Sequence, residues 1–218
     1  MQPLFEQYRP KSWNDVIAQE KIIARIDQLR RRGLAGRAYW LSGQSGTGKT
    51  TIALLLAHEV ADPFNVVEVD ASELTSAAVR DLERSLQTRG LGERSGRAVV
   101  INESHGLRRD TVRQLLVTLE RLPSHVIFVF TTTCEGEAAL FEGCEDSHPL
   151  LSRCIVLPLS RRDLAKPFAE RARMIAQAEG LDGRPLSDYV KLLQTHRNNF
   201  RAAIQAIEGG CMIADCAT

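Results

Sequence analysis

The 218-residue sequence lacks the features that mark several special classes of protein. No apolar run approaches the ~20 residues that a membrane-spanning helix needs. The first thirteen residues are charged and interrupted by prolines, which is unlike a signal peptide. Positive and negative side chains nearly balance, at 28 Lys plus Arg against 27 Asp plus Glu, so no overall field attracts nucleic acid. We therefore expect a globular, cytoplasmic protein without membrane contacts, in which only a local patch of charge binds nucleic acid.

Cysteine is also too sparse and too irregular to define a scaffold. The five cysteines are an odd number without an export signal, which argues against a disulfide framework. None forms a Cys-x-x-Cys pair, so the sequence gives no zinc signature. We expect ordinary packing positions, not metal or redox roles, for Cys134, Cys144, Cys154, Cys211 and Cys216.

Two kinds of apolar stretch alternate along the first 160 residues. Short, nearly continuous apolar runs predict buried strands, and longer runs with apolar residues three and four apart predict helices. Such alternation predicts an α/β fold with a parallel five-stranded sheet between helices. The predicted strands cover residues 37–43, 65–72, 97–102, 125–133 and 154–159, and the predicted helices cover 14–33, 48–60, 76–90 and 109–123.

The pattern changes after Leu159. Three helical segments follow at 161–179, 186–195 and 198–208, without a strand between them. Pro167 indicates that the first of these helices starts late or kinks early. We therefore predict two domains, an α/β domain over residues 1–160 and a small three-helix domain over 161–218.

A glycine-rich motif, GQSGTGKT at residues 43–50, fits the phosphate-binding pattern G-x-x-x-x-G-K-[ST] and lies between a predicted strand and a predicted helix. Its glycines let backbone N–H groups point at phosphate oxygens, and the following helix presents its positive end to the same anion. Lys49 can reach the β- and γ-phosphates, and the Thr50 hydroxyl can bind Mg²⁺. We expect ATP and Mg²⁺ as cofactors, with phosphate contacts from Gly43, Gln44, Ser45, Gly46, Thr47, Gly48, Lys49, Thr50 and Thr51.

A polar pair, Asn102 and Glu103, ends the strand at 97–102 and is the best candidate for the metal and water side of this site. Glu103 is placed to polarise the water that attacks the γ-phosphate, although a polar strand end that caps the next helix is the simpler alternative. Similar motifs usually carry Asp where this chain has Asn102. An amide keeps an oxygen acceptor for metal-bound water but loses the negative charge, at a cost of a few kcal/mol, so we expect hydrolysis to slow ~10- to 1000-fold. His105 we interpret as a loop residue.

Several stretches together carry a resemblance to the AAA+ ATPases, and within them to the small subunits of DNA sliding-clamp loaders. YRPKSWNDVIAQEKI resembles the clamp-loader N-terminal box, NESHGLRRDTVRQLLVTLERLPSHVIFVFTTT resembles the Walker B strand, helix and sensor 1 strand, and LLSRC resembles the Ser-Arg-Cys motif. The resemblance implies a P-loop AAA+ module followed by a helical lid. It also implies that the N-terminal box wraps the adenine through Tyr8, Arg9, Pro10, Val16 and Ile17.

The same resemblance implies three residues that act on the γ-phosphate. Thr133 is the expected sensor 1, with Thr132 as the alternative. Arg153 is the expected arginine finger, which enters the ATP site of a neighbouring subunit, and a surface arginine is its alternative. NNFRAAIQAIE resembles the sensor 2 helix of the lid and implies Arg201 as sensor 2, although Asn stands where the family commonly has Gly.

In clamp loaders the inner surface follows the DNA backbone through the N-termini of central helices. Matching positions here offer hydroxyls and guanidiniums to phosphates, although charged exposed helix faces are common and solvent exposure is an equal alternative. The DNA candidates are Thr75, Ser76, Arg80, Arg108, Arg109 and Arg113.

Three functions remain open at this point. The first is a clamp-loader-like ATPase that assembles with other AAA+ subunits, as a homo- or hetero-oligomer, and engages DNA with a sliding clamp or another replication protein. The second is a DNA-dependent motor such as a branch-migration helicase, and the third is an ATP-switched assembly subunit with little hydrolysis. Clamp-loader subunits continue into a collar domain, whereas this sequence ends after the lid, so we expect assembly to rely on the ATPase modules, another chain or DNA.

Overall fold

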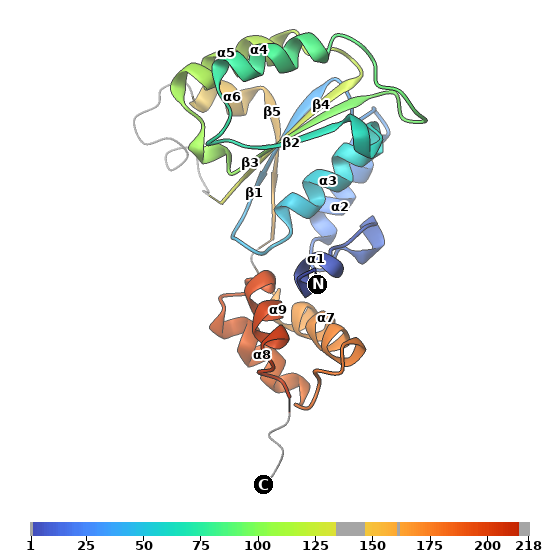
Figure 1. Cartoon of the computed structure of the whole chain (residues 1–218), viewed down its shortest axis with the longest axis vertical. Coiled ribbons are helices and arrows are strands. Elements are labelled where there is room, and N and C mark those ends of the chain that lie inside the picture. The colour runs from blue at the N-terminus through green and yellow to red at the C-terminus, as the bar shows by residue number, and fades with distance from the viewer. Residues whose placement is uncertain (1, 134–146, 161, 214–218) are drawn as a thin grey trace. The chain divides into compact units, whose positions relative to one another are not determined.

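The computed structural model describes residues 2–133, 147–160 and 162–213 (Figure 1). Its chain divides into two compact units. The sheet unit contains residues 21–43 and 49–159, and the helical unit contains residues 1–20, 44–48 and 160–218. The N-terminal segment thus groups with the C-terminal helices, whereas the sequence analysis assigns it to the α/β domain.

A five-stranded parallel sheet forms the centre of the sheet unit, in the order β2-β3-β4-β1-β5. This confirms the predicted fold class. Each strand contains β-branched or aromatic side chains, which suit a pleated surface. The three central strands are buried on both faces, whereas the two edge strands are partly exposed. The strands are β1 (Arg37–Ser42), β2 (Val66–Asp70), β3 (Arg97–Asn102), β4 (Val126–Thr132) and β5 (Cys154–Pro158).

Helices cover this sheet on two sides. The helix α3 packs against β3 and β4, while α4 and α5 lie side by side (Figure 1) and bury the opposite set of strand side chains. Trp40, Phe128 and Phe130 alternate along their strands with residues of the other face, and the Trp40 and Phe130 rings stack with their centroids 5.4 Å apart. The helices are α2 (Glu20–Arg30), α3 (Lys49–Val60), α4 (Ser76–Ser85), α5 (Arg109–Glu120) and α6 (Ser147–Ser152).

The helical unit has its own apolar core. The aromatic residues Phe168 and Tyr189 are buried in it together with aliphatic side chains of all three long helices. Pro167 occupies the third position of the first long helix, where its missing N–H costs no hydrogen bond, so the prediction of a late start is confirmed. The helices are α1 (Leu4–Gln7), α7 (Ala165–Ala178), α8 (Leu186–Thr195) and α9 (Phe200–Glu208).

The sequence-based element boundaries differ from the structure mainly at helix ends. The helix predicted over 14–33 begins only at Glu20, because Ala18 adopts a left-handed backbone conformation with φ of 59° after a short 3₁₀ turn. The short helices α1 and α6 are absent from the prediction, since each is too short to show a helical period. Cys134, Cys144 and Cys216 lie outside the described residues; Cys154 and Cys211 are free thiols.

Candidate functional site

The phosphate loop follows β1 and leads into α3, as its motif requires. Positive φ angles of 77° at Gly46 and 96° at Gly48 place both residues in a conformation that favours glycine and that turns backbone N–H groups to one side. The Thr47 hydroxyl donates to the Gln44 carbonyl oxygen at 2.8 Å, which closes the loop on itself. Lys49 is the first residue of α3 and its side chain is buried.

The polar ends of β3 and β4 meet the first turn of α3. The Thr50 hydroxyl donates to Asn102 Oδ1 at 3.4 Å, and the Thr131 hydroxyl donates to the same oxygen at 3.0 Å. Mg²⁺ binds oxygen ligands, directly or through its waters. The structure therefore brings together the two oxygens, Thr50 Oγ1 and Asn102 Oδ1, that the sequence assigns to the metal.

Asn102 also has a partner that the sequence analysis missed. Its Nδ2 group donates to Glu68 Oε1 at 2.6 Å, from β3 across to the neighbouring strand β2. The strand register pairs Asp70 with Asn102, so Glu68 lies two residues back on the adjacent strand. Side chains two residues apart on neighbouring strands lie on the same face of a sheet. The contact between Glu68 and Asn102 could therefore have been predicted if the strand register had been known.

Glu103 stands in a strained backbone conformation at the end of β3, with φ of 49° and ψ of 48°. Non-glycine residues rarely adopt this left-handed region, and strain of this kind concentrates at functional sites. The Glu103 N–H donates to Thr131 Oγ1 at 3.4 Å, which holds the turn against β4. The carboxylate oxygen Oε2 accepts a hydrogen bond from the Thr133 hydroxyl at 3.3 Å.

The two sensor 1 candidates, Thr133 and Thr132, differ in their contacts with this carboxylate. Thr133 contacts Glu103 directly, whereas Thr132 is buried and its hydroxyl lies 3.3 Å from His105 Nδ1. His105 Nδ1 is in turn 3.4 Å from Glu103 Oε2. The threonine that contacts Asn102 is Thr131, which the sequence analysis did not name, because three consecutive threonines at a strand end cannot be told apart without the register.

Arg153 is held within its own sheet unit. Its Nη2 group forms an ion pair with Glu120 Oε1 at the end of α5, and its Nη1 group donates to the Pro149 carbonyl oxygen in α6 at 2.9 Å. About a third of the Arg153 side chain, 34%, is exposed. The guanidinium is thus held at the surface, between the end of α5 and the helix α6.

The residues predicted for adenine and sensor 2 belong to the helical unit. Tyr8 and Ile17 pack against the core of that unit, and the Tyr8 hydroxyl donates to Glu179 Oε1 at 2.6 Å, which raises the pKa of the phenol. Arg9 forms an ion pair with Glu6, and Val16 follows the short 3₁₀ turn after Pro10. The Arg201 guanidinium lies 5.3 Å from the centroid of the Phe5 ring.

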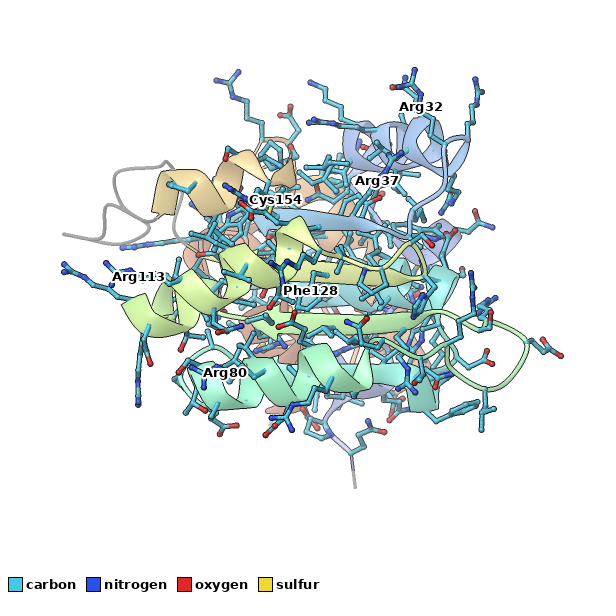
Figure 2. The ribbon with its side chains drawn as sticks, turned by 90° about the horizontal axis from the view of Figure 1, so that it is seen from above. Arg32, Arg37, Arg80, Arg113, Phe128 and Cys154 are labelled. Atoms are coloured by element: carbon cyan, nitrogen blue, oxygen red, sulfur yellow. The ribbon has the colours of Figure 1, made fainter. Side chains whose placement is uncertain are left out.

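The DNA candidates lie at the start of α4 and α5. Thr75 caps α4 by accepting from the Ala78 N–H at 3.2 Å, Ser76 follows it, and Arg108 precedes the first residue of α5, Arg109. Arg80 Nε donates to Gln114 Oε1 at 3.2 Å and so joins the two helices. Figure 2 shows Arg80 and Arg113 on the same side of the view, with Arg113 projecting outward from α5.

A match to a known family covers the part of the chain that carries this polar cluster. Residues 39–138 match the family described as "ATPase family associated with various cellular activities (AAA)". Residues 39–138 of the chain are thus similar to an AAA ATPase domain. Within the described residues, no helix of the chain is both long enough and apolar enough to cross a membrane.

Curated relatives with similar sequences are replication proteins. Replication factor C small subunit 1 of Pyrobaculum arsenaticum is 27% identical over 210 residues, which cover 94% of this chain and 60% of the relative. DNA polymerase III subunit gamma of Buchnera aphidicola is 32% identical over 155 residues, covering 61% of this chain and 43% of the relative. The chain with the AAA domain therefore spans about 60% or less of the length of these two relatives.

Solved structures with the same fold include the RuvB Holliday junction branch migration motor of Thermotoga maritima. The TM-score is 0.71 at 23% identity, over 92% of this chain and 64% of that chain. At this identity the likeness concerns the fold alone.

Proposed function

We propose that this chain is an ATPase subunit that binds ATP and Mg²⁺ where two subunits meet and engages DNA in a clamp-loader-like role in replication. The observation that carries the proposal is the polar cluster at the ends of β3 and β4, where Thr50, Asn102 and Glu103 lie close together, with Thr50 the last residue of the phosphate-binding motif. The names of the curated relatives supply the replication context. The fold likeness to the branch-migration motor gives no comparable support for a motor.

The residues of the chain divide the work of phosphoryl transfer. Backbone N–H groups of Gly43–Thr51 and the Lys49 ammonium hold the phosphates, and Tyr8, Arg9, Pro10, Val16 and Ile17 hold the adenine. Thr50 and Asn102 provide the oxygens for Mg²⁺, which when bound neutralises charge on the phosphate oxygens. Arg201 contributes a further positive charge from the lid.

Glu103 is the general base that activates the attacking water. Its carboxylate takes the proton of the attacking water, and the Thr133 hydroxyl, 3.3 Å from Oε2, keeps the carboxylate oriented. Glu103 adopts a left-handed backbone conformation with φ of 49°, and strain of this kind concentrates at functional sites. Arg153 acts on the ATP of the neighbouring subunit, where its guanidinium neutralises charge on the transferring group.

We further propose that Asn102 makes this ATPase slow. The Asn102 amide supplies an oxygen to the metal side of the site but no negative charge, so the metal is held less firmly in the transition state. The same residue favours, as a second candidate function, an ATP-switched assembly subunit with little hydrolysis. Both share nucleotide binding and assembly and differ only in turnover.

The proposed DNA surface is formed by the starts of α4 and α5. Hydroxyls of Thr75 and Ser76 and the guanidiniums of Arg80, Arg108, Arg109 and Arg113 bind backbone phosphates without reading sequence. Such contacts position the protein on DNA and make affinity fall with salt.

Phosphate release measured with and without primed DNA tests the proposal. Wild-type protein is expected to release phosphate with Mg²⁺ and to release it faster with DNA. Glu103→Gln should lower the rate ~100-fold or more while ATP still binds, because the amide cannot accept the proton. The matched control is Glu73→Gln, an exposed position before α4, which should behave as wild type. Equal rates for Glu103→Gln and wild type would refute the assigned role, and a silent wild type would favour the switch.

A further inference from the structure

A cavity of about 680 Å³, largely open to solvent, lies at the amino-terminal end of the sheet. Its lining comes from the segments just before β1, β3 and β4 and from the end of α3. The polar cluster with Asn102 and Glu103 lies where β3 and β4 end, so the cavity and the candidate ATP site occupy opposite edges of the same sheet. Nothing in the proposed ATPase mechanism uses this cavity.

Four arginines line the cavity against a single carboxylate. Arg30 is the last residue of α2 and Arg32 lies in the turn that follows it, while Arg89 and Arg94 come from the loop between α4 and β3. Glu59 is the one acidic residue of the lining, and Arg30 Nε lies 2.8 Å and 2.9 Å from its two oxygens. The fold thus neutralises Arg30.

The other three guanidiniums keep their charge. Among the residues that the structure describes, Arg32, Arg89 and Arg94 have no carboxylate within ion-pair distance, and all three are exposed. Arg89 Nη1 makes only a long contact of 3.4 Å to Ser95 Oγ. The lining residues therefore carry a net of three positive charges that no ion pair within the described residues offsets.

The bottom of the cavity is built from closely packed backbone. A Cβ atom on Gly96 would lie 2.3 Å from the Val60 carbonyl oxygen and 2.9 Å from the His125 carbonyl oxygen, so only glycine fits there. The Gly96 N–H donates to Val60 at 3.2 Å and the Arg97 N–H donates to His125 at 3.0 Å. These contacts fix the loops that hold Arg94 and Ser95 and give the cavity a defined shape.

We propose that this cavity binds a small molecule that carries a chain of two or more phosphate groups. A compact ligand with about three negative charges matches the excess charge, and guanidinium forks bind phosphate oxygens in pairs. The volume lies within the range of ~300–1,000 Å³ that is usual for small-molecule sites. A carboxylate-rich peptide would spread the same charge over several residues of extended chain, so it matches the cluster of arginines less well than a compact phosphate compound.

The position of the arginines favours a small ligand over the DNA backbone. Figure 2 shows Arg32 and Arg37, at the start of β1, far from Arg80 and Arg113 in the view. The proposed DNA surface at α4 and α5 is therefore separate from the cavity. A backbone-binding surface would be expected to continue as a strip of charge, whereas these arginines surround one concave site.

Calorimetric titration with sodium tripolyphosphate tests this inference, in Lys49→Ala protein so that the phosphate loop is disabled. We expect one saturable site per chain that survives Lys49→Ala. The double variant Arg32→Gln/Arg94→Gln should weaken it ~10-fold or more. The control Arg31→Gln/Arg121→Gln removes the same charge from exposed positions outside the lining, and should change affinity less than ~2-fold. Thermal unfolding verifies that each variant is folded.

Four results would overturn the inference. The first is the absence of saturable binding in the Lys49→Ala protein. Equal weakening by the lining and control pairs would indicate diffuse attraction by charge, and binding of citrate as tight as that of tripolyphosphate would indicate a site for anions in general. Displacement of tripolyphosphate from this site by a single-stranded oligonucleotide would indicate a nucleic-acid surface. None of these outcomes depends on the ATPase activity.

Discussion

At the scale of residues, Asn102 connects three elements through one amide. Its Oδ1 atom accepts hydrogen bonds from Thr50 at the start of α3 and Thr131 on β4, while its Nδ2 donates to Glu68 on β2. A carboxylate at this position could accept from both threonines but could not donate to Glu68. The amide therefore suits its neighbours, because it can accept from the two threonines and donate to Glu68.

Replacement of Asn102 by Asp should depend on what stands at position 68. The Asn102→Asp change puts a second carboxylate beside Glu68 and should lower the melting temperature in the absence of Mg²⁺ by ~1–2 °C, since facing like charges on a sheet cost ~0.5 kcal/mol. In Asn102→Asp/Glu68→Gln the glutamine amide can donate to the new carboxylate, so most of that loss should disappear.

A double-mutant cycle on these two positions, measured by thermal unfolding without nucleotide, gives the coupling energy. Independent, additive effects at positions 68 and 102 would show that the contact between Asn102 and Glu68 has no energetic weight. Phosphate release by the same variants shows separately whether Asp at 102 speeds hydrolysis.

A site residue can be predicted from the sequence when a local sequence motif contains it. The phosphate loop is a contiguous motif with a known chemical purpose, and the sequence locates it without the fold. Strand register makes Glu68 and Thr131 the partners of Asn102. In this register Asp70 lies opposite Asn102 and Leu41 lies opposite Thr131. Register depends on how strands that are distant in sequence pair, so the sequence alone does not reveal these partners. The sequence could not distinguish Thr131 from Thr132 and Thr133 for the same reason.

At the scale of elements, α5 and α6 hold Arg153 at the surface of the sheet unit. The ion pair with Glu120 is exposed on both sides, at 34% and 57% of the two side chains. Exposed pairs contribute ~0–1 kcal/mol to stability. The ion pair with Glu120 therefore contributes little to folding, so loss of Arg153 can be tested for an effect on activity separately from stability.

The variant Arg153→Ala separates these explanations. We expect its melting temperature to fall by no more than ~3 °C, and its phosphate release per subunit to fall ~1000-fold because a neighbouring site loses its guanidinium. Arg121→Ala is the matched control, since Arg121 directly follows Glu120 at the end of α5 and is also exposed. A rate for Arg153→Ala equal to that of the control would show that no neighbouring ATP site uses this arginine.

The edge strand β5 carries a thiol that should affect stability at high pH. Burial raises the pKa of the Cys154 thiol to about 12. The unfolded chain releases this proton at lower pH than the folded chain, so folding stability should fall as pH rises from about 9 towards 12. Cys154→Ala should reduce this fall in urea-unfolding experiments, whereas the exposed Cys211→Ala should change it less. Identical pH dependence in wild type and Cys154→Ala would contradict the burial of the thiol.

Helices and strands can be predicted from the sequence where their pattern of apolar residues is long and regular. The strands are found within a few residues because their apolar runs are bounded by polar or glycine residues. The ends of α2 and α4 are less predictable, because the start of α2 depends on the turn at Ala18 and the end of α4 at Ser85 on local capping. Short helices such as α6 depend on tertiary contacts with α5 and β5.

At the scale of the whole molecule, the proposed chemistry requires more than one chain. The described part of the AAA domain contains the phosphate loop, Asn102 and Glu103, whereas the proposed finger Arg153 pairs with Glu120 of its own chain. ATP should therefore promote assembly. Light scattering after size exclusion should show a larger species when wild-type protein is mixed with a non-hydrolysable ATP analogue, and no such species for Lys49→Ala. A wild-type protein whose size stays unchanged at a saturating concentration of the analogue would contradict nucleotide-driven assembly.

The central claim is that one active site is built from two chains, and a mixing experiment tests it most directly. Glu103→Gln protein keeps the finger but lacks the base, and Arg153→Ala protein keeps the base but lacks the finger. Each alone should release almost no phosphate. In a mixture with Mg²⁺ and primed DNA, an Arg153 from one chain can face a Glu103 from the other, so phosphate release should recover to a fraction of the wild-type rate. A mixture that stays as inactive as its components while it still assembles, or an Arg153→Ala protein that is fully active alone, would contradict the account.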